Sequence, residues 1–195
     1  MNNQIIRENI RIKRKKLSEV DRNNAAIKVA NLACNFKKIK SAKNIALFSS
    51  FDGEISTLPL INILWKKNTQ VFLPKIQSFS KKTVFFLKYK KNTVLKVNRF
   101  NISEPIAKNE TKNFIDEIEI ILVPLVAFNS KGYRLGMGCG FYDFLLKDWK
   151  KKKFIPVGIA YNFQLVKKIK INSWDIPLPY IITPKKIWFW KKNFF

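Results

Sequence analysis

Residues 134–143 combine one arginine, three alternating glycines and a final Tyr-Asp pair. Alternating glycines let backbone amides turn toward one point and let an anion approach closely. Arg134 adds a planar cation with donors suited to phosphate, and Asp143 adds a carboxylate suited to a hard cation such as Mg²⁺. The pattern predicts a site for the phosphates of a nucleotide together with a metal ion.

This segment differs from the two common glycine motifs of nucleotide-binding proteins. It lacks the Gly-Lys-Ser/Thr ending of the P-loop, and its G-x-G-x-G spacing differs from the Rossmann fingerprint and does not directly follow a predicted strand. Three simpler interpretations stay open: a tight turn for the glycines, a surface salt bridge for Arg134 and a helix-terminal charge for Asp143. The Tyr142-Asp143 pair, together with Arg134, favours the phosphate site over these.

The 195-residue chain contains no histidine, and this excludes several kinds of active site. Serine or cysteine nucleophiles activated by histidine and histidine-ligated zinc are ruled out. Proton transfer would have to use carboxylates, tyrosine, lysine, water or the substrate itself. The two cysteines, Cys34 and Cys139, are expected to be free thiols, because a lone pair in a cytosolic chain rarely forms a disulfide.

Lysine and arginine number 38 against 13 acidic residues, giving a formal net charge of +25. One interpretation is a basic nucleic-acid-binding domain, with Trp188 and Trp190 close to lysines as stacking residues. We favour another: the chain is rich in Lys, Asn, Ile and Phe, its lysines are scattered, and the excess reflects base composition. Such a surface would still draw anionic substrates closer.

Hydrophobic periodicity predicts helices alternating with strands. Helices are expected at residues 5–17, at residues 18–36 behind a Ser18–Asp21 capping box, from Thr57 with Pro59 in the first turn, and at residues 141–149. Strands are expected at residues 45–48, 70–73 (ended by Pro74), 84–89, 118–123, 155–160 and 180–183, with residues 100–105 extended.

This alternation predicts one α/β domain over residues 1–195, with helices layered on both faces of a mainly parallel, mixed sheet. No apolar run reaches the ~18 residues that span a bilayer, and the basic N-terminus lacks a signal-peptide core. We therefore expect a cytoplasmic monomer that acts on small molecules, without a membrane or a specific nucleic-acid partner. Residues 191–195 are expected to be a loose end.

Residues 131–143, with residues 123–128 before them, closely resemble the signature of the 5-formyltetrahydrofolate cyclo-ligase family. Its members are also called 5,10-methenyltetrahydrofolate synthetases. Further similarity lies at residues 48–54 with Thr57, residues 101–105, residues 156–158, Trp174-Asp175 and residues 182–184. The resemblance runs in order, without large gaps, from Ile5 to Trp190.

The resemblance implies a sugar-isomerase/CoA-transferase-like fold and an ATP-dependent ring closure. MgATP phosphorylates the formyl oxygen of 5-formyltetrahydrofolate, N10 attacks the activated carbon, and phosphate leaves to give 5,10-methenyltetrahydrofolate. This chemistry needs a phosphate cradle, a metal and positive charge, but no histidine. Because the nucleophile is a nitrogen of the substrate, proximity can replace a catalytic base.

The resemblance also implies which residues bind each substrate. The expected ATP contacts are Arg7, Arg134, Leu135, Gly136, Met137, Gly138, Cys139, Gly140, Phe141 and Tyr142. Residues 137–141 would also face the folate. Arg134 and Tyr142 are the expected catalytic residues, and Asp143 and Asp175 are the expected Mg²⁺ ligands.

On the folate side, the resemblance implies contacts from Phe51, Glu54 and Ser56. Ser56 stands where the family carries a carboxylate that contacts the substrate. A carboxylate accepts two hydrogen bonds from the pterin N–H groups, which serine cannot do. Either Glu54 takes over this function, or folate binding is weaker. Phe100 is a candidate for stacking on the pterin, and core packing is the open alternative for it and for Phe51.

A second departure from the family is at Asn3, where the family carries a lysine that reaches the triphosphate. Arg7 matches the arginine of the same clamp. Arg11 and Lys13 either compensate for Asn3 or line a solvated basic face. The two departures also raise the possibility of an eroded enzyme that keeps its fold, against which the intact segment 134–143 argues.

Overall fold

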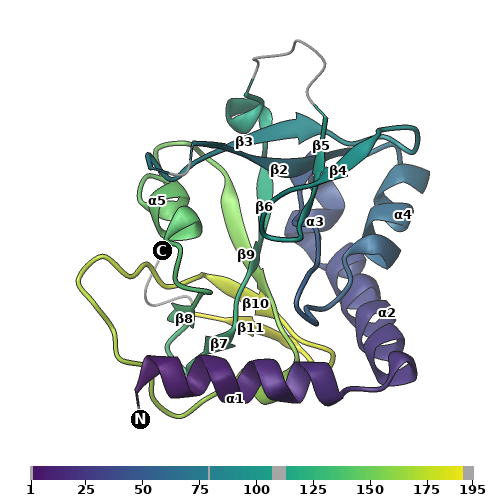
Figure 1. Ribbon diagram of the computed structural model, residues 1–195. Coiled ribbons are helices and arrows are strands. Elements are labelled where there is room, and N and C mark those ends of the chain that lie inside the picture. The colour runs from purple at the N-terminus through teal and green to yellow at the C-terminus, as the bar shows by residue number, and fades with distance from the viewer. Residues whose placement is uncertain (1, 79, 107–112, 191–195) are drawn as a thin grey trace.

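The computed structural model describes residues 2–78, 80–106 and 113–190. At its centre, seven strands form one sheet in the order β11-β10-β9-β6-β1-β2-β3 (Figure 1). These strands are β1 (Asn44–Ala46), β2 (Gln70–Ser78), β3 (Thr83–Lys88), β6 (Ile120–Pro124), β9 (Ile155–Ile159), β10 (Tyr180–Ile182) and β11 (Ile187–Phe189). Only the edge strands β3 and β11 pair antiparallel. The predicted mainly parallel, mixed α/β sheet is confirmed.

Helices and two short hairpins complete the fold. The helices are α1 (Asn3–Lys16), α2 (Glu19–Asn35), α3 (Lys37–Ser41), α4 (Leu58–Lys66) and α5 (Phe141–Leu146), with single 3-10 turns η1 (Ile115–Glu117) and η2 (Asn162–Gln164). The hairpins pair β4 (Leu95–Val97) with β5 (Ser103–Pro105) and β7 (Ala127–Phe128) with β8 (Arg134–Leu135). Among the described residues, no helix has the length and apolar character needed to cross a membrane.

Two apolar cores cover the two faces of the sheet. On one face, the small residues Ala26 and Ala30 of α2 bring this helix close to Ile45 and Leu122. On the other face, α5 packs Leu146 in a separate cluster of buried side chains that continues into strands β2, β6 and β10. Strand β6 is buried along its first four residues, as expected for a parallel strand covered on both faces. These three layers position the loops that follow the strands.

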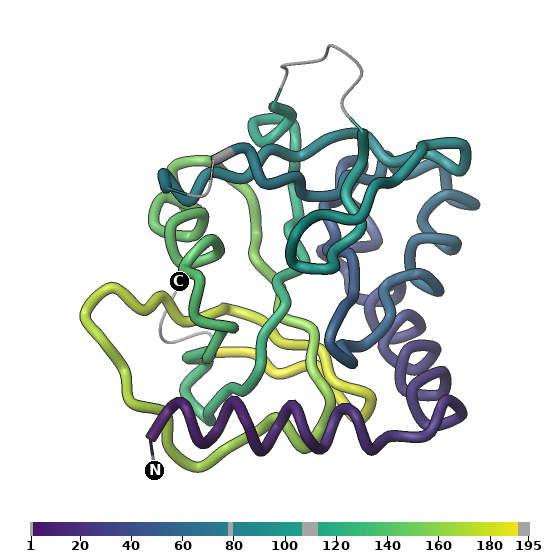
Figure 2. The backbone as a smooth tube through the Cα atoms, in the orientation of Figure 1, coloured from purple at the N-terminus to yellow at the C-terminus, as the bar shows by residue number. Residues whose placement is uncertain are grey.

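The order of the strands creates a point where the chain changes direction. From β1 the chain moves outward to β2, whereas from the neighbouring β6 it moves the opposite way to β9 and β10. The loops after β1 and β6 therefore diverge, and ligands in open α/β sheets bind at the carboxyl ends of strands at such a point. Helix α1 lies across this end, beside β7 and β8 (Figure 2).

Several predicted elements require correction. The prediction that Pro74 ends its strand is wrong, because β2 continues to Ser78 with Pro74 opposite Phe86 of β3. Pairing with β1 stops two residues earlier, at Phe72, so no strand on that side needs the missing N–H of Pro74. Helix α5 ends at Leu146, three residues before the predicted end.

Other differences concern turns and caps. Of the extended segment predicted at residues 100–105, only β5 is a strand, because the Asn98 side chain accepts hydrogen bonds from Phe100 and Ile102 and forms a turn. The Thr57 hydroxyl does not cap α4; it donates to the carbonyl of Phe48. Strand β11 and helix α3 were not predicted. Residues 191–195 lie outside the described residues.

Candidate active site

Two loops and one helix form the candidate site. The β1 loop, residues 49–57, follows β1 and carries the predicted folate contacts. The glycine loop, residues 134–143, runs from β8 to the start of α5 and carries the predicted ATP contacts. Helix α1 contacts both loops, so segments that are far apart in the sequence meet at one end of the sheet.

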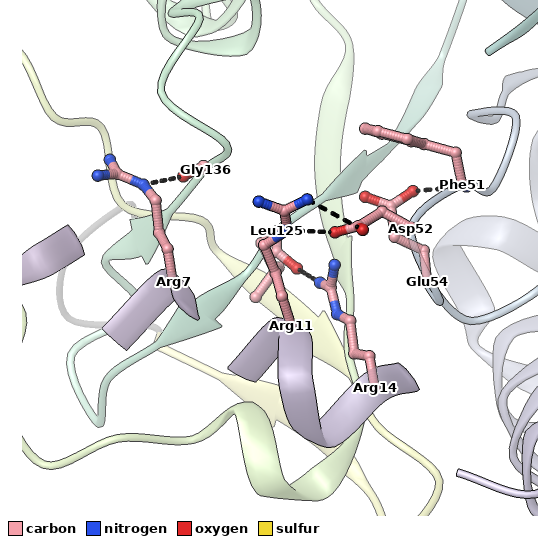
Figure 3. A network of polar contacts seen from close by, with 8 residues as sticks. All are labelled: Arg7, Arg11, Arg14, Phe51, Asp52, Glu54, Leu125 and Gly136. Atoms are coloured by element: carbon pink, nitrogen blue, oxygen red, sulfur yellow. Dashed lines mark hydrogen bonds and ion pairs between the residues drawn. The ribbon is translucent and has the colours of Figure 1, made fainter. Parts of the chain in front are cut away.

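Three arginines on one side of α1 make these contacts, at the spacing i, i+4 and i+7 (Figure 3). Arg7 donates from Nε to the carbonyl of Gly136 at 2.8 Å. Arg11 binds both carboxylate oxygens of Asp52, at 2.6 and 3.1 Å. Arg14 donates to the carbonyl of Leu125, directly after β6. One face of one helix therefore ties together the glycine loop, the β1 loop and the end of β6.

Arg14 is the most deeply buried of the three, with 1% of its surface exposed. Its Nε and Nη1 have no hydrogen-bond partner within the described residues. Burial lowers the pKa of the guanidinium, while the charges of Glu54 and Asp52 oppose that change. A Cβ added to Gly53 would lie 2.9 Å from the Arg14 Cβ, so the β1 loop packs directly on α1.

Glu54 lies at the base of the β1 loop, where burial raises the pKa of its carboxyl to about 7. The nearby Arg14 and a 3.3 Å hydrogen bond from the Phe51 amide lower the pKa of this group, and Asp52 raises it further. A carboxyl in this environment changes its charge near neutral pH. Ser56 was also predicted to contact the folate. Its hydroxyl accepts a hydrogen bond from the Leu58 amide, 3.3 Å away, at the start of α4.

Arg134 and Asp143 form an ion pair across the glycine loop. The arginine is only 7% exposed and also donates to the carbonyl of Ile176 at 2.8 Å. Burial lowers the pKa of Arg134, and the carboxylates of Asp143 and Asp175 oppose the change. The sequence analysis left a surface salt bridge open as an alternative for Arg134. The salt bridge exists, but the arginine is buried rather than on the surface.

Tyr142 places its hydroxyl in a buried position, without a hydrogen-bond partner among the described residues. Burial raises the pKa of this phenol, the charge of Glu54 raises it further, and Arg134 lowers it. The hydroxyl is therefore protonated at neutral pH. It can donate a hydrogen bond to a substrate oxygen, but it is a poor general base.

The two predicted metal ligands, Asp143 and Asp175, both lie near enough to Arg134 for their charges to act on its guanidinium. Asp143 keeps 38% of its side chain exposed, and Asp175 accepts from the Asn172 amide at 2.8 Å. One oxygen of each carboxylate, Oδ2 of Asp143 and Oδ1 of Asp175, makes no hydrogen bond within the described residues. In that part of the chain, no three cysteine or carboxylate side chains gather into a complete metal site. Two carboxylate oxygens fit Mg²⁺ that takes its other ligands from water and phosphate.

The remaining predicted ATP contacts are spread over different environments. Gly136 has no atom within 4 Å of where a Cβ would lie, whereas Gly140 lies against the Lys82 side chain, and the Cys139 thiol is free and exposed. Leu135 is buried against Ile6 and Ile10 of α1, so its side chain belongs to the core and only its backbone is left for a ligand. Met137 packs at the edge of the same cluster, and Gly138 and Phe141 complete the loop.

Asn3 does not act as a replacement for a lysine. Its side chain exchanges two hydrogen bonds with the backbone of Lys170, at 2.9 and 3.0 Å, and fastens the start of α1 to the C-terminal part of the chain. Arg11 pairs with Asp52 while 42% of its side chain stays exposed, so it contacts the β1 loop from a partly solvated position. Lys13 is exposed, as the interpretation of a solvated basic face predicted. The ring of Phe100 lies under the guanidinium of Arg99, 4.9 Å from its centre.

The aromatic residues considered for nucleic-acid binding are engaged within the chain. Trp188 and Trp190 stack on one another at 6.2 Å and pack against the core on the α5 side of the sheet. Trp190 also donates to the carbonyl of Ser130 at 2.6 Å. These contacts give both rings a structural function.

Known proteins resemble this chain in sequence and in fold. The model of the 5-formyltetrahydrofolate cyclo-ligase family matches residues 1–184. The chain belongs to this family. The prediction of an enzyme of the ligase class is therefore confirmed.

Relatives in this family cover nearly the whole chain. A 5-formyltetrahydrofolate cyclo-ligase of Haemophilus influenzae is 45% identical over 175 residues, 90% of this chain and 94% of its own. That of Escherichia coli K12 is 39% identical over 181 residues, 93% of this chain and 100% of its own. The NMR structure of Aquifex aeolicus 5,10-methenyltetrahydrofolate synthetase has a TM-score of 0.82 at 31% identity, covering 98% of this chain and 94% of that one. The cyclo-ligase family thus accounts for both the sequence and the fold.

Proposed function

We propose that this chain closes the ring of 5-formyltetrahydrofolate to 5,10-methenyltetrahydrofolate, using MgATP and releasing ADP and phosphate. The observation that carries the proposal is the contact of Arg7 with the glycine loop. This arginine bonds the Gly136 carbonyl, and its Cζ lies 3.9 Å from where a Cβ of Gly138 would be. A fixed cation therefore stands over the loop whose backbone is open enough for phosphate.

In the first step, the formyl oxygen of the folate attacks the γ-phosphorus of ATP, and the bond to the ADP oxygen breaks. Phosphoryl transfer is accelerated by placing the reactants and by positive charge near the phosphoryl oxygens. Arg7 and the backbone amides of the glycine loop supply the binding contacts. Arg134, held by Asp143 and Ile176, supplies a buried cation beside them. The neutral hydroxyl of Tyr142 is placed to donate a hydrogen bond.

In the second step, N10 of the folate attacks the activated formyl carbon, phosphate leaves with the formyl oxygen, and N10 loses its proton. The β1 loop orients the pterin for this attack. We assign Phe51 to its ring face and Glu54 to its N–H groups, because an ionised carboxylate accepts two such bonds. Ser56 is occupied at the start of α4, so Glu54 carries the acidic contact alone.

The free oxygens of Asp143 and Asp175 would hold Mg²⁺, which neutralises charge on the phosphates when bound. The arginines and the loop amides bind the phosphates, and N10 of the folate closes the ring. Residues 137–141 lie between the two substrates in this arrangement, with their backbone toward ATP and their outer edge toward the folate.

The test follows absorbance of the methenyl product in the near ultraviolet. Purified protein is mixed with 5-formyltetrahydrofolate, ATP and Mg²⁺, and the expected result is a rise in absorbance that needs all three. Reactions without ATP, and with a non-hydrolysable ATP analogue, are the controls. A folded protein that gives no rise with the complete mixture would overturn the proposed activity.

A further inference from the structure

The turn between β2 and β3 brings a lysine onto the glycine loop. A Cβ built on Gly140 would lie 3.0 Å from the Nζ of Lys82 and 3.4 Å from its Cδ and Cε. The lysine side chain therefore lies along the backbone of Gly140, with its ammonium at the loop. In Figure 1 the β2–β3 hairpin lies beside α5, the helix that Gly140 precedes.

The backbone of Lys82 is unusual for this residue type. Its φ of 50° lies in the left-handed region that glycine and asparagine favour at turns. A side chain that is kept in a strained backbone conformation often has a function at that position. The ammonium of Lys82 makes no hydrogen bond or ion pair with any residue that the structure describes, so its position on the loop leaves its donors free.

Lys82 and Arg7 approach the glycine loop from different elements. The guanidinium of Arg7, from α1, lies 3.9 Å from where a Cβ of Gly138 would be, and the ammonium of Lys82 lies beside Gly140, two residues further along. Both of these residues have positive φ, a conformation that favours glycine. Because glycine has no side chain, nothing separates the two cations from the backbone. The loop thus has a cation beside Gly138 and another beside Gly140.

We infer that Lys82 binds the phosphate groups of ATP on the glycine loop, as a second cation opposite Arg7. The inference rests on the proposed function and adds a residue to its nucleotide site. In this arrangement an ammonium with three donors contacts phosphate oxygens as a point charge. It neutralises charge on the phosphoryl group while the bond to the ADP oxygen breaks, and it keeps its own proton throughout.

Two lysine variants separate this role from general loss of charge. Lys82→Met removes the ammonium and keeps most of the chain length. Lys153→Met is the matched control, since Lys153 is also exposed and also has positive φ, at 60°, but it lies in the turn before β9. Both variants lose one positive charge, so the net charge of the protein falls equally in both.

The experiment measures MgATP binding by calorimetry and the KM values for ATP and folate by the absorbance assay. Lys82→Met should weaken MgATP binding and raise the KM for ATP by about tenfold, as expected for one charge-assisted hydrogen bond. The KM for folate should not change, and Lys153→Met should match the original protein. Equal ATP affinity in the two variants would overturn the role of Lys82.

The outcomes also separate this inference from the proposed reaction. Weakened MgATP binding in Lys82→Met, in a protein that never forms the methenyl product, would support the lysine contact and overturn the cyclisation. Full cyclisation with unchanged ATP affinity in Lys82→Met would support the proposed reaction and overturn the lysine contact. Lys82→Gly adds a check on folding, because it removes the ammonium while relieving the positive φ, and it should weaken ATP binding without lowering Tm.

Discussion

The β1 loop follows β1 and the glycine loop follows β8, and both contact helix α1, but they are built in opposite ways. The glycine loop offers mainly backbone, with left-handed conformations at Gly138 and Gly140 and cations that arrive from other elements. The β1 loop offers side chains and is held in place by α1 through Arg11 and Arg14. A loop that binds through its backbone depends on a few glycines, whereas a loop that binds through side chains can redistribute its contacts. This difference accounts for an intact glycine motif beside a substituted Ser56.

The largest expected effect concerns the ion pair of the glycine loop. Asp143→Ala leaves the guanidinium of Arg134 buried without its bonded partner, so the free energy of unfolding should fall by about 3–5 kcal/mol. Urea denaturation measures this change. In the double variant Asp143→Ala with Arg134→Met, part of the stability should return because the buried charge is gone. A single variant as stable as the original protein would show that the pair does not hold the loop.

Gly136→Ala should remove activity without weakening the fold. No atom lies within 4 Å of a Cβ at this position, and its φ is outside the left-handed region. Alanine at such a site is neutral or stabilises by up to about 1 kcal/mol, whereas the new methyl group points into the space assigned to substrate. Displaced reactants should lower kcat/KM by about a hundredfold. Thermal unfolding and the absorbance assay measure the two effects, and full activity would place the substrates elsewhere.

Arg11→Ala tests whether the β1 loop serves the folate separately from ATP. Losing the contact with Asp52 should raise the KM for folate several-fold and leave the KM for ATP unchanged. Because Arg11 is 42% exposed, the stability loss should stay below about 1 kcal/mol. Lys13→Ala, on the same helix and exposed, is the control for lost charge. An equal rise in both KM values would mean that the two loops do not act independently.

The last prediction concerns the pH dependence of stability set by Glu54. Its pKa is raised from 4.5 to about 7, so the folded state holds the proton more tightly than the unfolded state. The resulting stability is fully present below pH 4.5 and is lost as pH rises through about 7, at about 1.4 kcal/mol for each pKa unit. Denaturation of the original protein and of Glu54→Gln at pH 4.5 and pH 8 measures it. The variant should lose this slope, and an unchanged slope would assign it to another group.

Strands that are buried on both faces could be predicted from the sequence alone. The run Ile-Ile-Leu-Val of β6 was predicted as a strand and is one, but its position next to β1 is known only from the fold. Short elements could not be predicted in this way. Strand β11 has only three residues. Strand β2 continues past Pro74 because β3 pairs with it there, whereas β1 does not. Both depend on partners that are distant in the sequence.

The candidate site was predictable where its chemistry is local. The glycine loop could be recognised because its arginine, glycines and carboxylate lie within ten residues. The three arginines of α1 were harder to interpret, since the same spacing also suits a solvated basic face. The buried isoleucines Ile6 and Ile10, on the same helix, were the available indication that this helix packs on the sheet. Only the fold shows that Arg11 and Arg14 reach the β1 loop and Leu125.

The bond between Asn3 and Lys170 joins residues 167 positions apart. During synthesis α1 leaves the ribosome well before its partners at Leu125, Gly136 and Lys170. Its apolar side, with Ile6 and Ile10, must therefore wait uncovered while most of the chain is made. The contacts of α1 cannot all form before Lys170 has been translated, so we expect no partly active product from a chain that ends before that residue.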